Sequence, residues 1–230
     1  MKERLQSSQV EIAGWVLLLL GGSSKKAPLF LSPVAARMSL IKQSSRLTEM
    51  SWVFRVTGRI DVLFANAGTG EEVAPLGSIT ESHFHTIFSI NVKGLLFTVQ
   101  KALPLFQDGS IILTSSAGGS KGFEGLSVYN ATKAAVRSFA RSWTVDLKHR
   151  KIRVNTISPG PIATPTVSCF SMGLSEEQFE QFKKSVLNMV PLGRVGNPDE
   201  IAKAVAFLAS DDSSYITGIE LFVYGGIAQI

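Results

Sequence analysis

The chain has 230 residues, of which 45% are hydrophobic, and a formal net charge of +5. This length suits one α/β domain with a sizeable core. No apolar run reaches the roughly 18 residues that a membrane-spanning helix needs, which excludes an integral membrane protein of the helical kind. Cys169 is the single cysteine, so no intrachain disulfide can form and a reducing, cytoplasmic compartment is expected.

The positive charge is concentrated in the first quarter of the chain. Residues 1–60 carry nine Lys and Arg against three Asp and Glu, whereas residues 61–230 carry fourteen against fifteen. The basic residues are scattered singly, which favours a solvated surface over an arm that binds nucleic acid or a membrane. We therefore expect neither of these as a partner.

The first strong apolar run is Ile12–Leu20, and Gly21-Gly22-Ser23-Ser24 follows it. This pattern predicts a buried parallel strand that leads into the glycine turn of a dinucleotide-binding fold. The alternative is a secretory signal, because basic residues precede the run and small residues follow it. Glu3 and Glu11 weaken that alternative.

The segment between this turn and the next apolar strand is short. Only 37 residues, 23–59, separate Gly22 from the predicted strand Ile60–Phe64. An intact Rossmann half needs more than about fifty residues here, so at least one strand–helix unit must be missing or shortened. One hypothesis is that this N-terminus comes from a frameshift, a mis-set start or a spliced fragment, and a transit peptide is the competing account.

Regular patterning begins at Gly58. The strand Ile60–Phe64 ends in the turn Asn66-Ala67-Gly68, and a helix that carries Asn91 follows. An asparagine inside an apolar helix is costly unless its amide is hydrogen-bonded, so Asn91 is a candidate functional residue. His83 and His85 lie two apart, on different faces of a helix, and we expect no metal site from them.

The strongest chemical signal is the spacing of Ser116, Tyr129 and Lys133. Tyr129 and Lys133 are four residues apart and share a helix face. A free tyrosine releases its proton only near pH 10, and a neighbouring ammonium favours the phenolate. Ser116 ends a predicted strand, where its hydroxyl can bond a substrate oxygen. Together these residues predict a general-acid site for a carbonyl or an alcohol.

These residues have Asn66-Ala67-Gly68 and Asn91 before them and Pro159-Gly160 after them, an order that resembles the short-chain dehydrogenase/reductase family. The resemblance runs from about Gly58 to the C-terminus. It implies an α/β fold with a Rossmann-like doubly wound parallel sheet whose first βαβ portion is shortened or irregular. We expect residues 1–57 to be an incomplete N-terminal part of one Rossmann domain and residues 58–230 to be its catalytic part.

The resemblance also implies an activity, the NAD(P)-dependent interconversion of a ketone and a secondary alcohol by hydride transfer. Tyr129 would be the acid/base, Lys133 would hold the nicotinamide ribose, Ser116 would position the substrate oxygen and Asn91 would complete a proton relay. The cofactor, NAD or NADP, is expected to contact Gly21, Gly22, Asn66, Ala67, Gly68, Tyr129, Lys133, Pro159, Gly160, Ile162 and Thr164. Residues 165–192 would form a substrate lid.

The glycine turn departs from the family pattern Thr-Gly-x-x-x-Gly-x-Gly. Leu20 stands in place of threonine, and Lys25-Lys26-Ala27-Pro28 replaces the later glycines. The alternative function is therefore a catalytically impaired remnant, which retains the fold and the oligomer interface but binds cofactor poorly. In either case the resemblance implies a homodimer or homotetramer whose interface uses the apolar face of the helix 128–148. If the chain is an enzyme, the resemblance also implies a small carbonyl or alcohol substrate.

Overall fold

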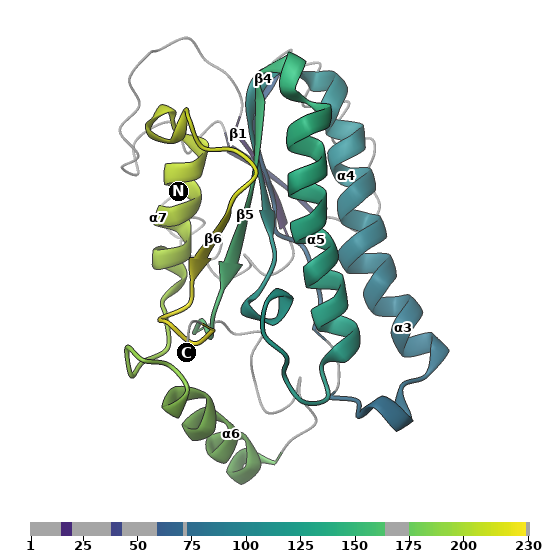
Figure 1. Cartoon of the computed structure of the whole chain (residues 1–230), viewed down its shortest axis with the longest axis vertical. Helices are drawn as coiled ribbons and strands as arrows, with labels where there is room; N and C mark the ends of the chain where they lie inside the picture. The colour runs from purple at the N-terminus through teal and green to yellow at the C-terminus, as the bar shows by residue number, and fades with distance from the viewer. Residues whose placement is uncertain (1–14, 20–37, 43–58, 71–72, 164–174, 229–230) are drawn as a thin grey trace, which may run out of the picture.

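The computed structural model describes residues 15–19, 38–42, 59–70, 73–163 and 175–228. Its centre is a six-stranded sheet in the order β2-β1-β3-β4-β5-β6 (Figure 1). The strands are β1 (Trp15–Leu19), β2 (Met38–Lys42), β3 (Ile60–Ala65), β4 (Phe106–Thr114), β5 (Ile152–Pro159) and β6 (Glu220–Val223). The last four pair in parallel, so their carboxyl ends lie at one edge of the sheet.

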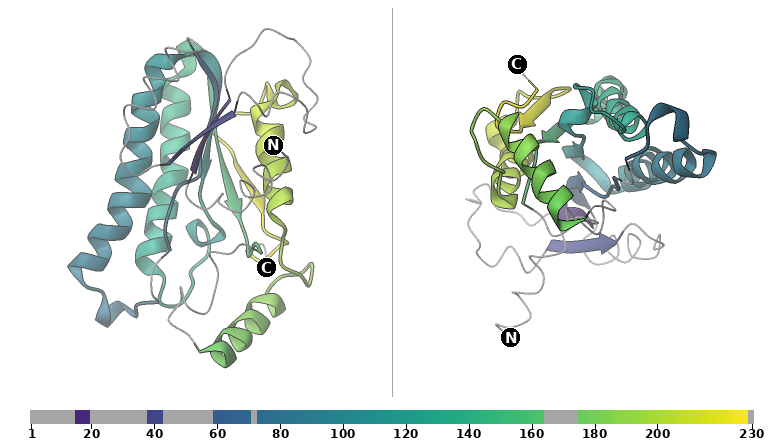
Figure 2. Two further views of the ribbon diagram at one scale, coloured as in Figure 1. Left: turned by 180° about the vertical axis from the view of Figure 1, so that it is seen from behind. Right: turned by 90° about the horizontal axis from the view of Figure 1, so that it is seen from below.

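Helices cover both faces of the parallel strands (Figures 1 and 2). One face carries α3 (Glu81–Phe88), α4 (Leu95–Ala102) and α5 (Ser127–Asp146), and the other carries α7 (Pro198–Ala209). Helix α6 (Glu176–Asn188), in the segment expected to be a lid, lies beyond the carboxyl ends of β5 and β6 (Figure 1).

The central strands are buried on both faces. Ile111 and Leu113 of β4 pack under α4 and α5, whereas Ile112 between them packs under α7. All three side chains are fully buried. A near-continuous apolar run is what a parallel strand covered on both sides requires, which explains why β3 and the second half of β4 were predictable from sequence.

The direction of β1 corrects the sequence-based expectation. The predicted strand exists, but it runs antiparallel to β3, with Leu19 opposite Val62 and Val16 opposite Ala65. It also pairs antiparallel with β2. An apolar run is compatible with either strand direction, and its pairing with β3 selects one. The irregularity expected in this portion is therefore found in the direction of β1, and its shortened length stays a prediction.

The sequence Asn197-Pro198-Asp199-Glu200 predicts a helix start, and α7 begins there with Asn197 as its N-cap. The Glu200 carboxylate accepts a hydrogen bond of 2.8 Å from the Asn197 backbone N–H. It also accepts two bonds, of 2.9 and 2.7 Å, from the Arg194 guanidinium. The Arg194 bond, followed by the Asn197 bond, lowers the pKa of Glu200 from 4.5 to about 2.

This lowered pKa predicts an acid-dependent loss of stability. A carboxyl whose folded-state pKa lies below its unfolded value stabilises the fold above the unfolded pKa and loses that contribution as the pH falls. Between about pH 4.5 and 2, wild type should therefore lose stability more steeply than Glu200→Gln. The pair is exposed, so the difference should be small and weakened by salt.

Thermal unfolding across this pH range tests the prediction. Asp199→Asn is the matched control, because it removes an exposed carboxylate from the same helix turn without removing the Arg194 pair. Identical pH slopes for wild type and Glu200→Gln would show that the pair adds nothing to stability.

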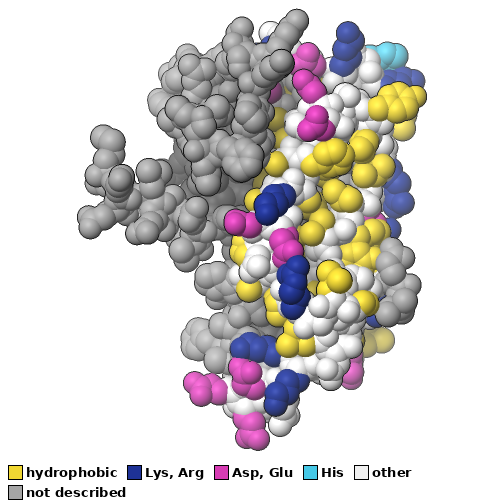
Figure 3. All heavy atoms as spheres, turned by 90° about the vertical axis from the view of Figure 1, so that its left-hand side faces the viewer, with side chains coloured by type: hydrophobic (Ala, Val, Ile, Leu, Met, Phe, Trp, Pro, Cys, Tyr) yellow, Lys and Arg dark blue, Asp and Glu magenta, His cyan; other side chains and the backbone are white. Residues whose placement is uncertain are grey.

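The face that carries α7 exposes hydrophobic side chains among acidic and basic ones (Figure 3). Phe207 of α7 is 39% exposed, and Tyr215 in the following loop is fully exposed.

In the part of the chain that the structure describes, no helix combines the length and apolar character needed to cross a membrane.

Candidate active site

The candidate site lies at the carboxyl edge of the parallel strands. After β4 ends at Thr114, the chain passes through Ser115 and Ser116, makes the turn η6 (Ala117–Gly119) and returns to begin α5. Tyr129 and Lys133 are in the first turns of α5. The end of β4 and the start of α5 thus place the three predicted catalytic residues, Ser116, Tyr129 and Lys133, at the same edge of the sheet.

Lys133 is almost fully buried, with 5% of its surface exposed. Its Nζ donates a hydrogen bond of 3.1 Å to the Thr114 carbonyl and lies 5.6 Å from the centre of the Tyr129 ring. The shared helix face predicted for Tyr129 and Lys133 is therefore confirmed. An ammonium has three donors, and among the described residues only one of them bonds a protein acceptor. As far as the described residues go, two donors are therefore left for a ligand.

The loop after β3 runs directly against this pair. A side chain at Gly68 would begin 3.2 Å from Asn91 Oδ1 and 3.3 Å from Lys133 Nζ. A side chain at Gly70 would begin 3.6 Å from the Tyr129 ring. The turn predicted at Asn66-Ala67-Gly68 thus lies beside the candidate site. Asn66 Oδ1 accepts a bond of 2.9 Å from the Thr114 hydroxyl, which joins the ends of β3 and β4.

Asn91 lies in a π-helical segment, Ser89–Gly94, between α3 and α4. Such distortions often mark functional sites. Its side chain, 1% exposed, accepts a bond of 2.8 Å from the Thr69 N–H and donates one of 2.8 Å to the Thr69 carbonyl. It also donates to Thr132 Oγ1 at 3.1 Å. The hydrogen bonds that a buried asparagine amide requires are therefore present, and the part of Asn91 in a proton relay stays a prediction.

Thr132 is a contributor that sequence reasoning missed. Its hydroxyl is fully buried, donates a bond of 2.7 Å to the Tyr129 carbonyl and accepts the bond from Asn91. Thr132 therefore links the loop-binding amide of Asn91 to the first turn of α5. Its position directly before Lys133, on an otherwise apolar helix face, was the available signal.

The two serines after β4 have different environments. Ser115 is 2% exposed and donates a bond of 2.8 Å to the Lys133 carbonyl, so it ties the strand end to α5. Ser116 is half-buried, and its Oγ accepts a bond of 3.1 Å from the Gly118 N–H. Because that bond uses an acceptor site, the Ser116 hydroxyl proton remains available to a ligand.

The segment after β5 carries the remaining predicted cofactor contacts. A Cβ atom at Gly160 would lie 2.6 Å from Tyr224 Cα, so only glycine fits at this position between Pro159 and Pro161. Ile162 forms a bridge with Gly196 whose bonds use the neighbouring Pro161 carbonyl and Ala163 N–H. The backbone groups of Ile162 itself therefore point away from Gly196. Gly21, Gly22 and Thr164 lie outside the described residues.

Known proteins resemble this chain in sequence and in fold. A family model described as Enoyl-(Acyl carrier protein) reductase matches residues 43–228. Oxidoreductase asL5 of Sarocladium schorii is 46% identical over 176 residues, which cover 75% of this chain and 68% of that protein. The 3-oxoacyl-[acyl-carrier-protein] reductase FabG of Thermotoga maritima is 38% identical over 173 residues, covering 74% and 67%. The crystal structure of levodione reductase superimposes with a TM-score of 0.74 at 33% identity, covering 78% of this chain and 70% of that one.

The chain therefore belongs to the short-chain dehydrogenase/reductase family of oxidoreductases. Its Rossmann-like sheet with flanking helices is the fold of that family, and by resemblance it is an enzyme of the dehydrogenase or reductase kind. The family match begins at residue 43, ahead of Gly58, where the motifs placed the start of the resemblance.

Proposed function

We propose that the chain is an NAD(P)-dependent oxidoreductase that interconverts a ketone and a secondary alcohol. The observation that carries this proposal is the buried Lys133 ammonium, held beside Tyr129 with two donors unused by the described protein. The site lies outside the carboxyl ends of parallel strands, where open α/β sheets bind nucleotides. A relative named for reduction of a 3-oxoacyl group supports a ketone as the substrate.

The described residues fit the nicotinamide half of the cofactor. The two spare donors of Lys133 suit neighbouring ribose hydroxyls, and the outward backbone groups of Ile162 suit a carboxamide. The turn Asn66-Ala67-Gly68 would contact the adenosine side, and Pro159 and Gly160 would flank the nicotinamide. When bound, NAD(P)H would supply the hydride that reaches the carbonyl carbon.

The side chains of the protein would transfer the proton and hold the substrate oxygen. Tyr129 donates its phenolic proton to the substrate oxygen in reduction and removes it in oxidation. The Lys133 ammonium stabilises the phenolate that results, and burial strengthens this interaction because little water screens it. Ser116 donates its free hydroxyl proton to the same substrate oxygen. Asn91 and Thr132 hold the Thr69 loop and α5 together behind Lys133, where a proton relay would run.

A spectrophotometric assay with NADH and NADPH against a panel of ketones tests this proposal. We expect Ser116→Ala to lower kcat/KM by about 10²-fold, the usual effect of removing one donor to a developing oxyanion. Ser127→Ala is the matched control, because it removes an exposed serine hydroxyl at the start of α5. A Ser116→Ala enzyme with the wild-type rate contradicts the assigned role. Absence of turnover and of dinucleotide binding favours the alternative, an impaired remnant that keeps the fold.

The proposal includes a homodimer or homotetramer and a cytoplasmic location. Helices α4 and α5 lie side by side, and their outer faces expose Phe97 (46%) and Val145 (62%). Phe139 and Trp143 of α5 stack with ring centres 4.8 Å apart and are only partly buried. An apolar face of this kind suits a second copy of the chain. Light scattering of the purified protein tests the oligomer, and a monomer at micromolar concentration contradicts it.

A further inference from the structure

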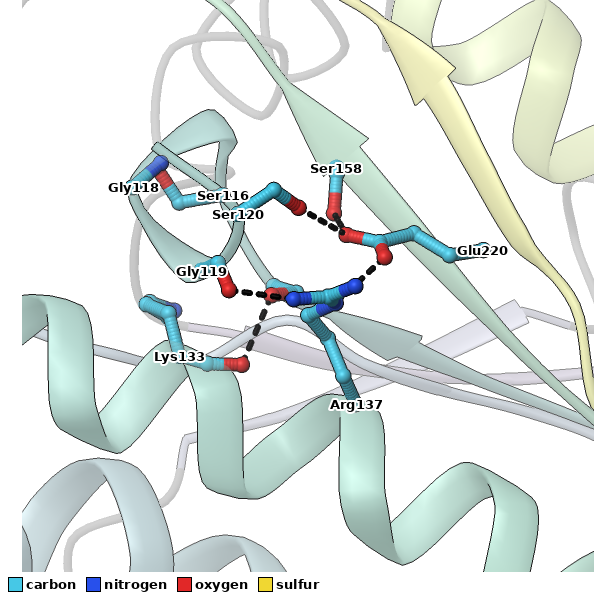
Figure 4. A network of polar contacts seen from close by, with 9 residues as sticks. Ser116, Gly118, Gly119, Ser120, Lys133, Arg137, Ser158 and Glu220 are labelled. Carbon is cyan, nitrogen blue, oxygen red and sulfur yellow. Dashed lines mark hydrogen bonds and ion pairs between the residues drawn. The ribbon is translucent and has the colours of Figure 1, made fainter. Parts of the chain in front are cut away.

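One carboxylate outside the predicted site joins several of its supporting segments. Glu220 is the first residue of β6, and its side chain is 13% exposed (Figure 4). Its Oε1 accepts bonds from the Ser158 hydroxyl at 2.6 Å and the Ser120 hydroxyl at 3.3 Å. Its Oε2 pairs with Nε of Arg137. A partly buried charge with these partners holds them in one arrangement, because losing its bond to Ser158 or to Arg137 leaves a partly desolvated polar group.

Arg137 extends the same network to the helix of the candidate site. It lies on α5 four residues after Lys133, and its Nη1 donates to the Gly119 carbonyl (Figure 4). The approach is close, since a side chain at Gly119 would begin 3.0 Å from Arg137 Cδ and 3.1 Å from the Lys133 backbone. The planar guanidinium thus bonds the turn and Glu220 at once, through different nitrogens.

The bonded atoms belong to the two segments that would carry substrate and cofactor. Gly119 and Ser120 end the turn that begins at Ser116, and the Gly118 N–H of this turn bonds Ser116 Oγ. Ser158 is fully buried and directly precedes Pro159 and Gly160. The register explains the geometry: Glu220 is paired with Thr156 of β5, so the side chain of Ser158, two residues on, lies on the same face of the sheet.

We propose that Glu220 and Arg137 are positioning residues for the reaction. Together they hold the turn 117–119, and through it the direction of the Ser116 hydroxyl, while the bond to Ser158 fixes the start of the segment 159–162. This inference rests on the proposed function for its catalytic consequence. Its structural part, the orientation of the turn, holds whether or not the chain turns over.

The structural part is tested without any cofactor, by amide hydrogen exchange of the whole chain measured by NMR. In Glu220→Gln and in Arg137→Lys, the Gly118 amide should exchange about tenfold faster than in wild type, because opening of the turn becomes easier. Amides of the core strand β4 should keep their protection. Glu200→Gln is the matched control, because it neutralises the carboxylate of the exposed Arg194–Glu200 pair. Unchanged exchange at Gly118 in both test variants overturns the proposal.

The catalytic part is tested by a double-mutant cycle on kcat/KM. Each of Glu220→Gln and Arg137→Lys should lower kcat/KM about tenfold in the wild-type background and have little further effect in Ser116→Ala, because they act through the Ser116 hydroxyl. Additive losses overturn the link to Ser116. Faster exchange at Gly118 in a chain without turnover supports the positioning of the turn and counts against the proposed function, so the two failures are distinguishable.

Discussion

This chain should bind NAD(H) and NADP(H) several orders of magnitude more weakly than relatives with a complete glycine turn. Dinucleotide affinity depends on glycines that let the pyrophosphate approach a helix N-terminus. Gly21 and Gly22 are kept, but Lys25-Lys26-Ala27-Pro28 replaces the later glycines. Each lost charge-assisted hydrogen bond costs roughly 1.5–3 kcal/mol, and several are lost together. The antiparallel direction of β1 should weaken dinucleotide binding further. Leu19, the last residue of β1, lies opposite Val62, toward the amino end of β3, whereas the candidate site lies at the carboxyl ends of the parallel strands.

Isothermal titration calorimetry of the purified chain with each dinucleotide measures the effect directly. Replacing residues 1–57 with the corresponding segment of a family member with an intact glycine turn should restore binding. The matched control is the same replacement with the grafted glycines changed to valine, which should bind as poorly as the original chain. Micromolar affinity in the unaltered chain would show that residues 20–45 form a phosphate site of a different kind.

Tyr129→Phe should lower kcat by about 10²–10⁴-fold, the range that a positioned general acid contributes. The substitution removes only the hydroxyl, so the ring can keep its place beside the Lys133 ammonium. Stability should therefore change little. The rate is measured in the unaltered chain if it turns over, and otherwise in the chain with the restored N-terminal segment.

Tyr215→Phe is the matched control for this loss, because it deletes a phenolic hydroxyl from a fully exposed side chain far along the sequence. It should leave the rate unchanged. Unfolding curves that coincide for all three proteins separate a loss of chemistry from a loss of structure. A Tyr129→Phe enzyme with nearly the wild-type rate would mean that another group transfers the proton.

Local sequence patterns determined the parts of the chain whose structure depends on near neighbours. The apolar runs in β3 and β4 predicted buried strands, and the Asn197 cap predicted the start of α7. The four-residue spacing of Tyr129 and Lys133 predicted their shared helix face, since helix geometry alone sets it. These patterns work because hydrophobic periodicity, capping and helix pitch act within a few residues.

Only the tertiary structure decided which distant groups meet. Glu220 and Arg137 are 83 residues apart in sequence, and Asn91 and Thr132 are 41 apart, so no local pattern pairs them. The direction of β1 was equally hidden, because an apolar run is compatible with either strand direction and only the pairing with β3 selects one. The sequence alone determined which chemical groups the site contains; the packing of α5 against β4, β5 and β6 decided how they are held, because buried polar groups must find partners wherever the folded chain places them.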